Sequence, residues 1–483
     1  MNKKGVALIA IIVMILVVIC CCCLLITGAA VLWMAPVQGV NALTETAPVK
    51  TPIQLPYVTR QAPESMTATP SAQVPSEGSG DLLPAKVSAE MEKIESQVME
   101  LRGIRLQGEI TRKLMTTEQL NEQVMGDFFA DYDEEENRRD TIILNLFGLL
   151  EKDYDLNAMF VDLYSEQIAG YYDNETKEMV VVADDAFGGP HRMTYAHEFT
   201  HALQDQAYDL RDGLGLDDQN CQLDSEYCAA VQALVEGDAT LTETLWFAKY
   251  STFKDKKEVF QYYNSYESPV YDTTPLFLQS DFLFPYDKGL NFVQTLYDQG
   301  GMAAVDQAYG SPPVSTEQIL HPERYPQDVP LKIEIADLDD ILGSEWQKID
   351  DNTLGEWYTY LLLSQSYEAN WNVAVDAAEM ASEGWGGDRY VVYNNPTTDE
   401  NVLVFRSQWD TDADATQFWD EFVTYGSQRW GSPEPDQSDF LRWDSAESIV
   451  VVARYEDQIL WMMAPDMKLL QEIWRQFPLF ISG

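Results

Sequence analysis

The sequence predicts an α+β protein that is mainly helical, carries a small antiparallel sheet near its C-terminus and begins with one transmembrane helix. Three observations lead to this fold class. A long uncharged run lies within the first 35 residues, apolar residues recur at three- and four-residue steps through the middle of the chain, and β-branched runs gather beyond residue 388. With 483 residues, 46% of them hydrophobic, the chain can form two or three domains with apolar cores.

The N-terminal run predicts a single-pass membrane anchor at its start. Gly5–Met34 contains no charged side chain, and its 30 residues exceed the roughly 20 that a helix needs to cross a bilayer. Lys3 and Lys4 precede the run and Glu45 is the first charge after it, so we expect the N-terminus in the cytoplasm and the rest of the chain outside. A cleaved signal peptide is the alternative, because Gly28–Ala30 are small residues.

Between the anchor and the first helix we expect an extended linker. Residues 36–85 hold eight of the 22 prolines, mixed with Ser and Thr, and show no apolar periodicity. After an anchor at 1–35 and this linker, we divide the chain into domains at 86–330 and 331–483. Helical spacing in the first domain predicts four helices, at Ala85–Leu106, Thr117–Tyr132, Ile142–Leu150 and Met159–Ile168.

A change of period then predicts a β-hairpin followed by a helix. Tyr171–Asp173 and the β-branched run Met179–Ala183 flank a polar turn, which is typical of a hairpin. Gly188–Pro190 interrupts the chain and suits the first turn of a new helix, with His191 in that turn. Because it precedes this helix, we also expect Met179–Ala183 to pair along its edge with an extended peptide.

The new helix carries the clearest chemical motif of the sequence. The chain has four histidines, and His197, Glu198 and His201 form an HExxH segment. Residues four apart point to one helix face, so both imidazoles can bind one Zn²⁺ while the glutamate reaches a water molecule on the metal. The pattern indicates Glu198 as a general base.

A catalytic zinc needs a third protein ligand, which we expect on a later helix. Ala229–Tyr250 is strongly helical and contains the EGDA segment that starts at Glu236. In these motifs the sequence resembles the gluzincin-type zinc metallopeptidases, over roughly residues 171–250. The resemblance implies a zincin-like domain at 86–330, a Zn²⁺ cofactor, a peptide or protein substrate, and Glu236 as the third ligand. The competing carboxylates are Glu226, Asp238 and Glu243.

Further segments resemble poorly characterised bacterial membrane-anchored gluzincin-like proteins: HALQDQ from His201, FPYDKG from Phe284, and STEQILHP from Ser315. In such an enzyme His321 would be catalytic, donating a hydrogen bond to the developing oxyanion, with Tyr286 the weaker candidate for that role. The alternative is that His321 only fixes a loop. Asp205, one turn beyond His201, either orients a ligand or caps the helix.

The last domain predicts a small antiparallel sheet covered by helices. Before this domain, a helix is expected to begin near Pro285 and to end at a Gly300–Gly301 break. Within the domain, the first two helices are expected at Leu354–Gln365 and Val373–Ala381. A turn at Gly384–Asp388 precedes a ββαββα order, with its segments at Arg389–Tyr393, Val402–Trp409, Ala413–Tyr425, Ser448–Tyr455, Gln458–Met463 and Leu469–Phe477. We assign the tryptophans of this domain to its core rather than to a binding platform.

Bulk properties narrow the remaining choices. With 31 basic and 79 acidic side chains, the formal charge is 31 − 79 = −48, which excludes a nucleic-acid reader that works through a basic surface. Cys221 and Cys228 lie in the exported part, where oxidising conditions favour a disulfide. The alternative functions are a noncatalytic, zinc-stabilised binding or sensor domain and an acidic surface scaffold; the sequence indicates no oligomeric state.

Overall fold

The computed structural model of the chain describes residues 83–120, 122, 134–174, 176–184, 186–434 and 440–481. All of these residues belong to one compact unit. The anchor predicted at 1–35 and residues 36–82 of the predicted linker lie outside the described residues, as does most of the helix predicted at Thr117–Tyr132. None of the described helices combines the length and apolar content needed to cross a membrane.

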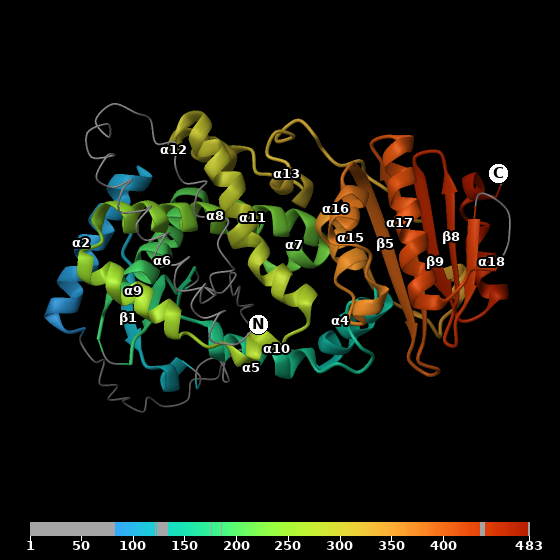
Figure 1. Cartoon of the computed structure of the whole chain (residues 1–483), viewed down its shortest axis with the longest axis horizontal. Coiled ribbons are helices and arrows are strands. Elements are labelled where there is room, and N and C mark those ends of the chain that lie inside the picture. The colour runs from blue at the N-terminus through green and yellow to red at the C-terminus, as the bar shows by residue number, and fades with distance from the viewer. Residues whose placement is uncertain are drawn as a thin grey trace, which may run out of the picture. The chain divides into compact units, whose positions relative to one another are not determined.

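The described residues before 330 form a mainly helical part with one small sheet (Figure 1). Its helices are α2 (Ala85–Arg102), α4 (Glu134–Leu146), α5 (Leu156–Gln167), α6 (Gly189–Tyr208), α7 (Asp218–Leu223), α8 (Ser225–Tyr250), α9 (Phe253–Ser265), α10 (Pro269–Thr273), α11 (Leu276–Gly300), α12 (Met302–Gly310) and α13 (Thr316–Leu320). The helices predicted near Ala85, Met159 and Ala229 are confirmed, whereas the helix predicted at Ile142–Leu150 begins at Glu134 and ends at Leu146. α2 ends earlier than predicted because Gly103 adopts a left-handed conformation, with φ at 81°, and caps the helix.

The small sheet has the strand order β1-β3-β2, formed by β1 (Thr111–Met115), β2 (Gly170–Asp173) and β3 (Glu178–Val182). The predicted hairpin is confirmed, because β2 and β3 pair antiparallel. β1 pairs with the other side of β3 in parallel. The expectation that Met179–Ala183 pairs with a peptide along its edge is therefore wrong, since both edges of the central strand are already hydrogen-bonded.

α8 and α11 form the longest helix pair of this part. α11 begins at Leu276, so the prediction that it starts near Pro285 is wrong, and Pro285 lies inside the helix. The buried side chains Phe277, Phe284 and Phe292 hold α11 in place on either side of the hydrogen bond that proline removes. The two helices approach so closely that a Cβ atom on Gly237 would overlap the carbonyl oxygen of Gly289.

The C-terminal part is a six-stranded antiparallel sheet with the order β4-β5-β6-β9-β8-β7. Its strands are β4 (Gln347–Asn352), β5 (Trp385–Asn395), β6 (Glu400–Trp409), β7 (Phe440–Asp444), β8 (Ile449–Tyr455) and β9 (Gln458–Ala464). The helices are α14 (Asp339–Leu342), α15 (Gly355–Ser364), α16 (Val375–Ser382), α17 (Asp412–Trp430) and α18 (Met467–Trp474), with short 3₁₀ turns at Ala369–Trp371 and Pro478–Phe480. The prediction of an α+β chain with a C-terminal antiparallel sheet is confirmed.

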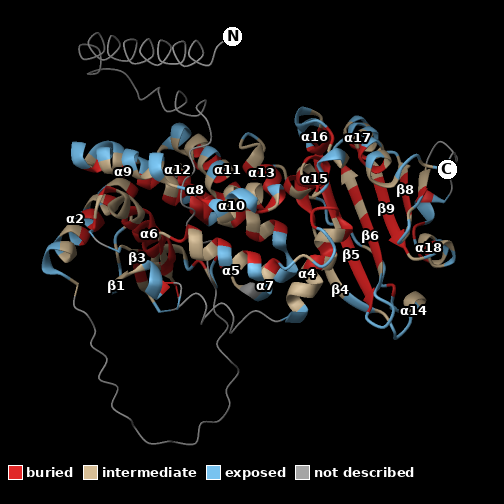
Figure 2. Ribbon diagram, turned by 60° about the horizontal axis from the view of Figure 1, so that its bottom comes forward, coloured by how far each residue is buried: buried red, intermediate tan, exposed pale blue. Residues whose placement is uncertain are grey.

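Both faces of this sheet are covered, as the buried colour of its central strands in Figure 2 shows. On β5, Tyr390 and Val392 join the core beneath α15 and α17, whereas Val391 and Tyr393 join a second core that contains Leu470 of α18. β4 and β7 add to the predicted ββαββα order, and β5 begins at Trp385, where a turn was expected. Four tryptophans are fully buried, which confirms their assignment to the core: Trp385, Trp409, Trp443 and Trp461.

The apolar core under α15 and α17 continues into the helical part. The ring of Phe147, just beyond α4, lies 5.1 Å from that of Tyr390 and 5.7 Å from that of Trp461. The hydroxyl of Tyr425 on α17 donates to the carbonyl oxygen of Phe147 at 3.1 Å. The helices before residue 330 and the sheet beyond it thus share a continuous set of buried side chains.

Candidate metal centre

α6 is held by its first turn and by one buried face. Pro190 lies in the first turn, and Nδ1 of His191 accepts a hydrogen bond from the backbone N–H of Gly188 at 3.0 Å, which confirms the predicted place of His191. Tyr195 and Phe199 pack with α2 and the small sheet in one apolar cluster. Because residues four apart share a helix face, this packing leaves the two motif histidines directed toward α8.

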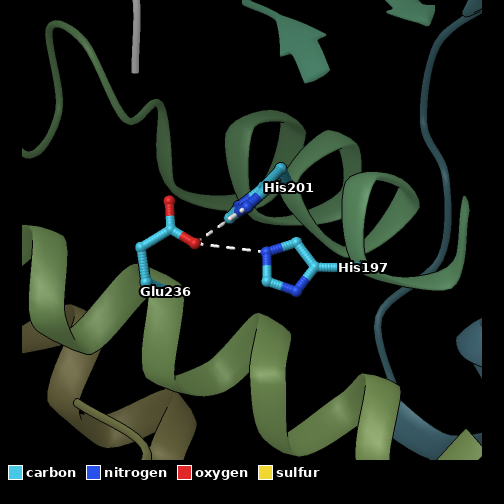
Figure 3. Close-up of side chains that lie close together, drawn as sticks. All are labelled: His197, His201 and Glu236. Atoms are coloured by element: carbon cyan, nitrogen blue, oxygen red, sulfur yellow. Dashed lines mark hydrogen bonds and ion pairs between the residues drawn. The ribbon is translucent and has the colours of Figure 1, made fainter. Parts of the chain in front are cut away.

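His197, His201 and Glu236 meet at one buried point, as predicted for the metal ligands (Figure 3). One ligand atom from each residue lies within 4.8 Å of the other two. Nε2 of His197 is 3.2 Å and Nε2 of His201 is 3.3 Å from the same oxygen, Oε2 of Glu236. All three side chains are almost completely buried, with exposed fractions between 1% and 4%.

The other nitrogen of each imidazole faces a hydrogen-bond acceptor. Nδ1 of His197 lies 3.0 Å from Oε2 of Glu243, and Nδ1 of His201 lies 2.8 Å from Oε1 of Gln204. The amide nitrogen of Gln204 donates to the carbonyl oxygen of Val235 and to Oδ2 of Asp238, which fixes the amide oxygen toward His201. These acceptors place the protons on Nδ1 and leave both Nε2 lone pairs for a metal ion.

The charges of the centre favour a cation among these atoms. Burial alone would lower the pKa of His197, but its contacts with Glu236 and Glu243 outweigh burial and raise the pKa to about 10. Burial would raise the pKa of Glu236, but the two histidines outweigh it and hold the pKa at about 2. The carboxylates thus stabilise positive charge at the imidazoles, and a divalent ion can replace the protons that supply it.

Glu198, which follows His197 on α6, is buried and has an unpartnered oxygen. Its side chain is 2% exposed, and no described residue hydrogen-bonds its Oε1 atom. Burial raises the pKa of Glu198 to about 7, near the value that suits a general base at neutral pH. Two imidazole nitrogens and one carboxylate oxygen are the donor set of a Zn²⁺ site with three protein ligands, so the residues present fit that ion.

The competing carboxylates have other partners. Asp238 pairs with Arg102, with 2.7 Å between Oδ1 and Nε, and both side chains are fully buried. Glu243 faces the nitrogen of His197 that points away from Glu236. Glu226 accepts hydrogen bonds from the backbone and hydroxyl of Thr316. Of the four candidate carboxylates, Glu236 is the one that faces Nε2 of both histidines.

Asp205 has neither of its two predicted roles. Its carboxylate accepts from the hydroxyl of Tyr172 at 2.9 Å and from Nζ of Lys177 at 2.6 Å. Tyr172 is on β2 and Lys177 directly precedes β3, so Asp205 attaches α6 to the hairpin. A sequence pattern gives no sign of this contact because the partners are about thirty positions away and belong to a sheet.

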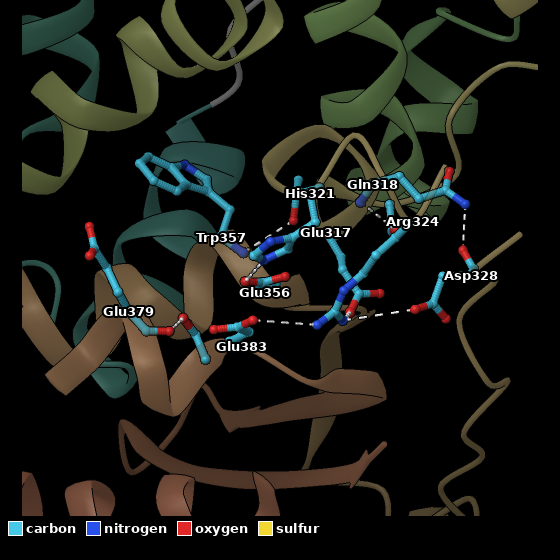
Figure 4. Close-up of polar contacts among 12 residues, drawn as sticks. Glu317, Gln318, His321, Arg324, Asp328, Glu356, Trp357, Glu379 and Glu383 are labelled. Carbon is cyan, nitrogen blue, oxygen red and sulfur yellow. Dashed lines mark hydrogen bonds and ion pairs between the residues drawn. The ribbon is translucent and has the colours of Figure 1, made fainter. Parts of the chain in front are cut away.

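His321 is not brought to the metal centre. Its Nε2 lies 2.8 Å from Oε1 of Glu356 on α15 (Figure 4). α13, which directly precedes His321, is hydrogen-bonded through Thr316 to Glu226, and Glu226 lies ten residues, roughly 15 Å of helix, before Glu236 on α8. This position argues against the predicted catalytic role of His321 and favours the alternative that it fixes a loop.

Tyr286, the weaker candidate in the sequence, lies beside the centre. Its ring centroid is 6.3 Å from that of His197. Its hydroxyl is buried, and no described residue hydrogen-bonds it. The position of Tyr286 depends on the packing of α11 against α8, which a sequence motif does not report.

A second group of carboxylates, Glu317, Asp328 and Asp410, lies near His321. The guanidinium of Arg324 lies among them: it pairs closely with Glu317 and lies 3.8 Å from Asp328 (Figure 4). It also lies 3.4 Å from Asp410. The single positive charge of Arg324 therefore offsets part of the negative charge of this group.

The predicted Cys221–Cys228 disulfide is confirmed. The two Cα atoms are 5.4 Å apart, and the bond joins α7 to the first turn of α8. It thereby fastens the start of the helix that carries Glu236.

The chain was compared with protein families, curated proteins and solved structures. A family model described as a domain of unknown function (DUF8575) matches residues 344–474, which extend from just before β4 to the end of α18. No curated protein and no solved structure matches the chain. The matched residues cover the C-terminal sheet and leave the candidate metal centre outside the match.

Proposed function

We propose that the chain is a membrane-anchored, extracytoplasmic zinc metallopeptidase with a zincin-like domain at residues 86–330 and a cytoplasmic N-terminus. One observation carries the proposal. His197, His201 and Glu236 converge at a single buried point, and Glu198, with its unpartnered oxygen, follows His197 directly on the same helix. A purely structural zinc site does not need such a base.

The proposed reaction is hydrolysis of a peptide bond. Zn²⁺ held by the three ligands would polarise the scissile carbonyl and make a water molecule acidic near pH 7. Glu198 accepts the proton of the attacking water and passes it to the leaving amine. Tyr286 donates its unpartnered hydroxyl to the oxygen that becomes negative, in the role first considered for His321.

In this proposal an extended substrate binds along the edge strand β2, rather than along β3 as the sequence suggested. A Cβ atom on Gly170 would lie 2.8 Å from Cγ2 of Thr194 and 3.5 Å from Cγ of Glu198, so the backbone of β2 runs against α6 beside the base. Edge strands bind extended peptides through backbone hydrogen bonds, with little dependence on sequence.

The Glu198→Gln variant tests this function. The full chain and the variant are purified in detergent with added zinc, bound zinc is counted, and cleavage of a mixture of peptides is followed by mass spectrometry. We expect one zinc in each protein, and a loss of activity in the variant of about 10²-fold or more because the proton acceptor is gone. Equal cleavage by both proteins would refute the proposal.

The rival function is a noncatalytic, zinc-stabilised binding or sensor domain. The observation that favours it is the burial of the ligands, none of which is more than 4% exposed. If the wild-type chain binds one zinc and cleaves no peptide, and if removal of zinc unfolds it, the rival function is correct.

A further inference from the structure

A cavity of about 860 Å³ lies between the helical part and the C-terminal sheet. Its walls come from α4, α5, α7, α8, α11, α15, β4 and β5. This volume falls in the range of about 300 to 1,000 Å³ that is typical of ligand sites. A larger cavity, of about 1330 Å³, lies between α4 and the C-terminal part, and none of the candidate site residues lines it.

The smaller cavity reaches the candidate metal centre through Tyr286. Tyr286 lines the cavity, and its ring is 6.3 Å from that of His197. Gln232, which also lines the cavity, is one turn before Glu236 on the same face of α8. The cavity and the metal centre are thus neighbours on the two sides of Tyr286, so a peptide whose scissile bond lies at the centre has this cavity as the adjacent space for its next side chains.

One wall of the cavity is aromatic. Phe160 and Tyr164 of α5 stack with their centroids 5.8 Å apart, and the ring of Phe282 on α11 lies 6.1 Å from that of Tyr164. All three side chains are partly exposed. Such a surface gains free energy by covering apolar side chains and has no charge with which to attract a charged one.

Charged groups that line the cavity have partners within the protein, as two examples show. Nε of Arg389 and Nζ of Lys348 lie 2.7 Å and 2.9 Å from the carboxylate of Asp351. Asp281 accepts hydrogen bonds from Nε1 of Trp357 and the hydroxyl of Tyr358, at 2.9 Å and 2.7 Å. With these groups satisfied, the partly exposed aromatic wall is the surface that an apolar side chain would cover.

One wall of the cavity belongs to the region that the domain model of unknown function matches. Ile349 is on β4 and Tyr358 is on α15, and both line the cavity opposite α5 and α11. The C-terminal sheet is therefore positioned to contact whatever enters the cavity.

We propose that this cavity binds an apolar segment of a peptide substrate next to the scissile bond, and that β4 and α15 of the C-terminal part form one of its walls. The proposal rests on the proposed peptidase function for its link to cleavage. Its binding component stands independently of catalysis, because the cavity is formed by residues other than the metal ligands.

Peptide binding tests the cavity without turnover. The Glu198→Gln chain in lipid nanodiscs is titrated with two fluorescent decapeptides that differ only in a central Phe-Leu or Ala-Ala pair. We expect the Phe-Leu peptide to bind at least about tenfold more tightly, because its larger side chains bury more apolar surface. Adding Phe282→Ala or Ile349→Ala, one on each wall, should remove most of this preference.

Phe260→Ala is the matched control, since Phe260 lies on α9, is 69% exposed and does not line the cavity. It should leave the preference unchanged, and the zinc content and melting temperature of every variant show whether it is folded. Phe160→Ala replaces Phe282→Ala if the latter fails to fold. Equal binding of the two peptides, or a preference that survives both wall variants, would overturn the proposal.

Cleavage of the same peptides by the wild-type chain separates this proposal from the peptidase function. Cleavage of both peptides at equal rates would show that the function is correct and the cavity proposal is wrong. No cleavage, together with selective binding that the wall variants abolish, would show that the cavity binds apolar peptide segments but that the peptidase function, and with it the link to a scissile bond, is wrong.

Discussion

Each imidazole of the candidate metal centre directs Nε2 toward Glu236 and Nδ1 toward a hydrogen-bond acceptor. The sequence predicts the contact with Glu236 but not the acceptor. HExxH spacing on a helix predicts that His197 and His201 share a face, and the resemblance to gluzincins implied Glu236. That Gln204 accepts a hydrogen bond from Nδ1 of His201, and itself donates to Asp238, could not be predicted, because it depends on how α6 crosses α8. The position of Tyr286 could not be predicted either: the FPYDKG motif makes it a candidate, but its distance from His197 depends on how α11 packs.

At this scale, the choice between Tyr286 and His321 gives a direct prediction. Tyr286→Phe should lower kcat about 10²- to 10³-fold because it removes a donor to the developing oxyanion. The zinc content of the variant should be unchanged. His321→Gln should leave kcat near the wild-type value. Steady-state kinetics on one peptide measure both, and a larger loss in His321→Gln than in Tyr286→Phe would contradict this assignment.

At the scale of elements, strong local patterns were predictable and pairings between distant segments were not. The apolar spacing of α2 and the β-branched run of β3 are properties of short segments. β1 was missed because Thr111–Met115 is rich in charge: Arg112 pairs with Glu95 of α2, and Lys113 pairs with Glu178 of β3. The predicted start of α11 is too late because a proline normally occurs in the first turn of a helix. Here Pro285 lies inside α11, and packing against α8 outweighs the lost hydrogen bond.

The crossing of α8 and α11 predicts a sharp sensitivity at Gly289. A methyl group there would overlap the carbonyl oxygen of Ala233, so Gly289→Ala should destabilise the fold by about 1 to 3 kcal/mol or more and displace α11 together with Tyr286. Gly310→Ala is the control, because a Cβ atom at this helix end meets no other atom within 4 Å. Urea unfolding measures both; equal stability of the two variants would show that the helices do not cross here.

The attachment of α2 to α8 predicts a second contrast. Arg102→Met should lower the free energy of unfolding by about 3 to 5 kcal/mol, since it leaves the fully buried carboxylate of Asp238 without its cation. Lys249→Met breaks a pair with Glu100 between the same two helices, but both side chains are more than half exposed, so the cost should be about 0 to 1 kcal/mol. Similar losses in urea unfolding would contradict this distinction.

At the scale of the whole molecule, the sequence predicts the fold class but not the contacts between distant parts of the chain. The α+β class and the C-terminal antiparallel sheet followed from local periodicity. The apolar core that continues from Phe147 to Trp461 and the cavity beside it were not predictable, because they join residues several hundred positions apart. On the proposed topology the charge of −48 belongs almost wholly to the exported part, where it favours solubility and repels anionic surfaces.

The most direct test of the account is to locate zinc in crystals of the zinc-loaded chain by anomalous scattering at the zinc edge. We predict one peak, about 2.0 to 2.2 Å from Nε2 of His197, Nε2 of His201 and an oxygen of Glu236. Zinc at the Glu317–Asp328–Asp410 group instead, or no peak in fully metal-replete crystals, would contradict the assignment of the metal centre on which the proposed function depends.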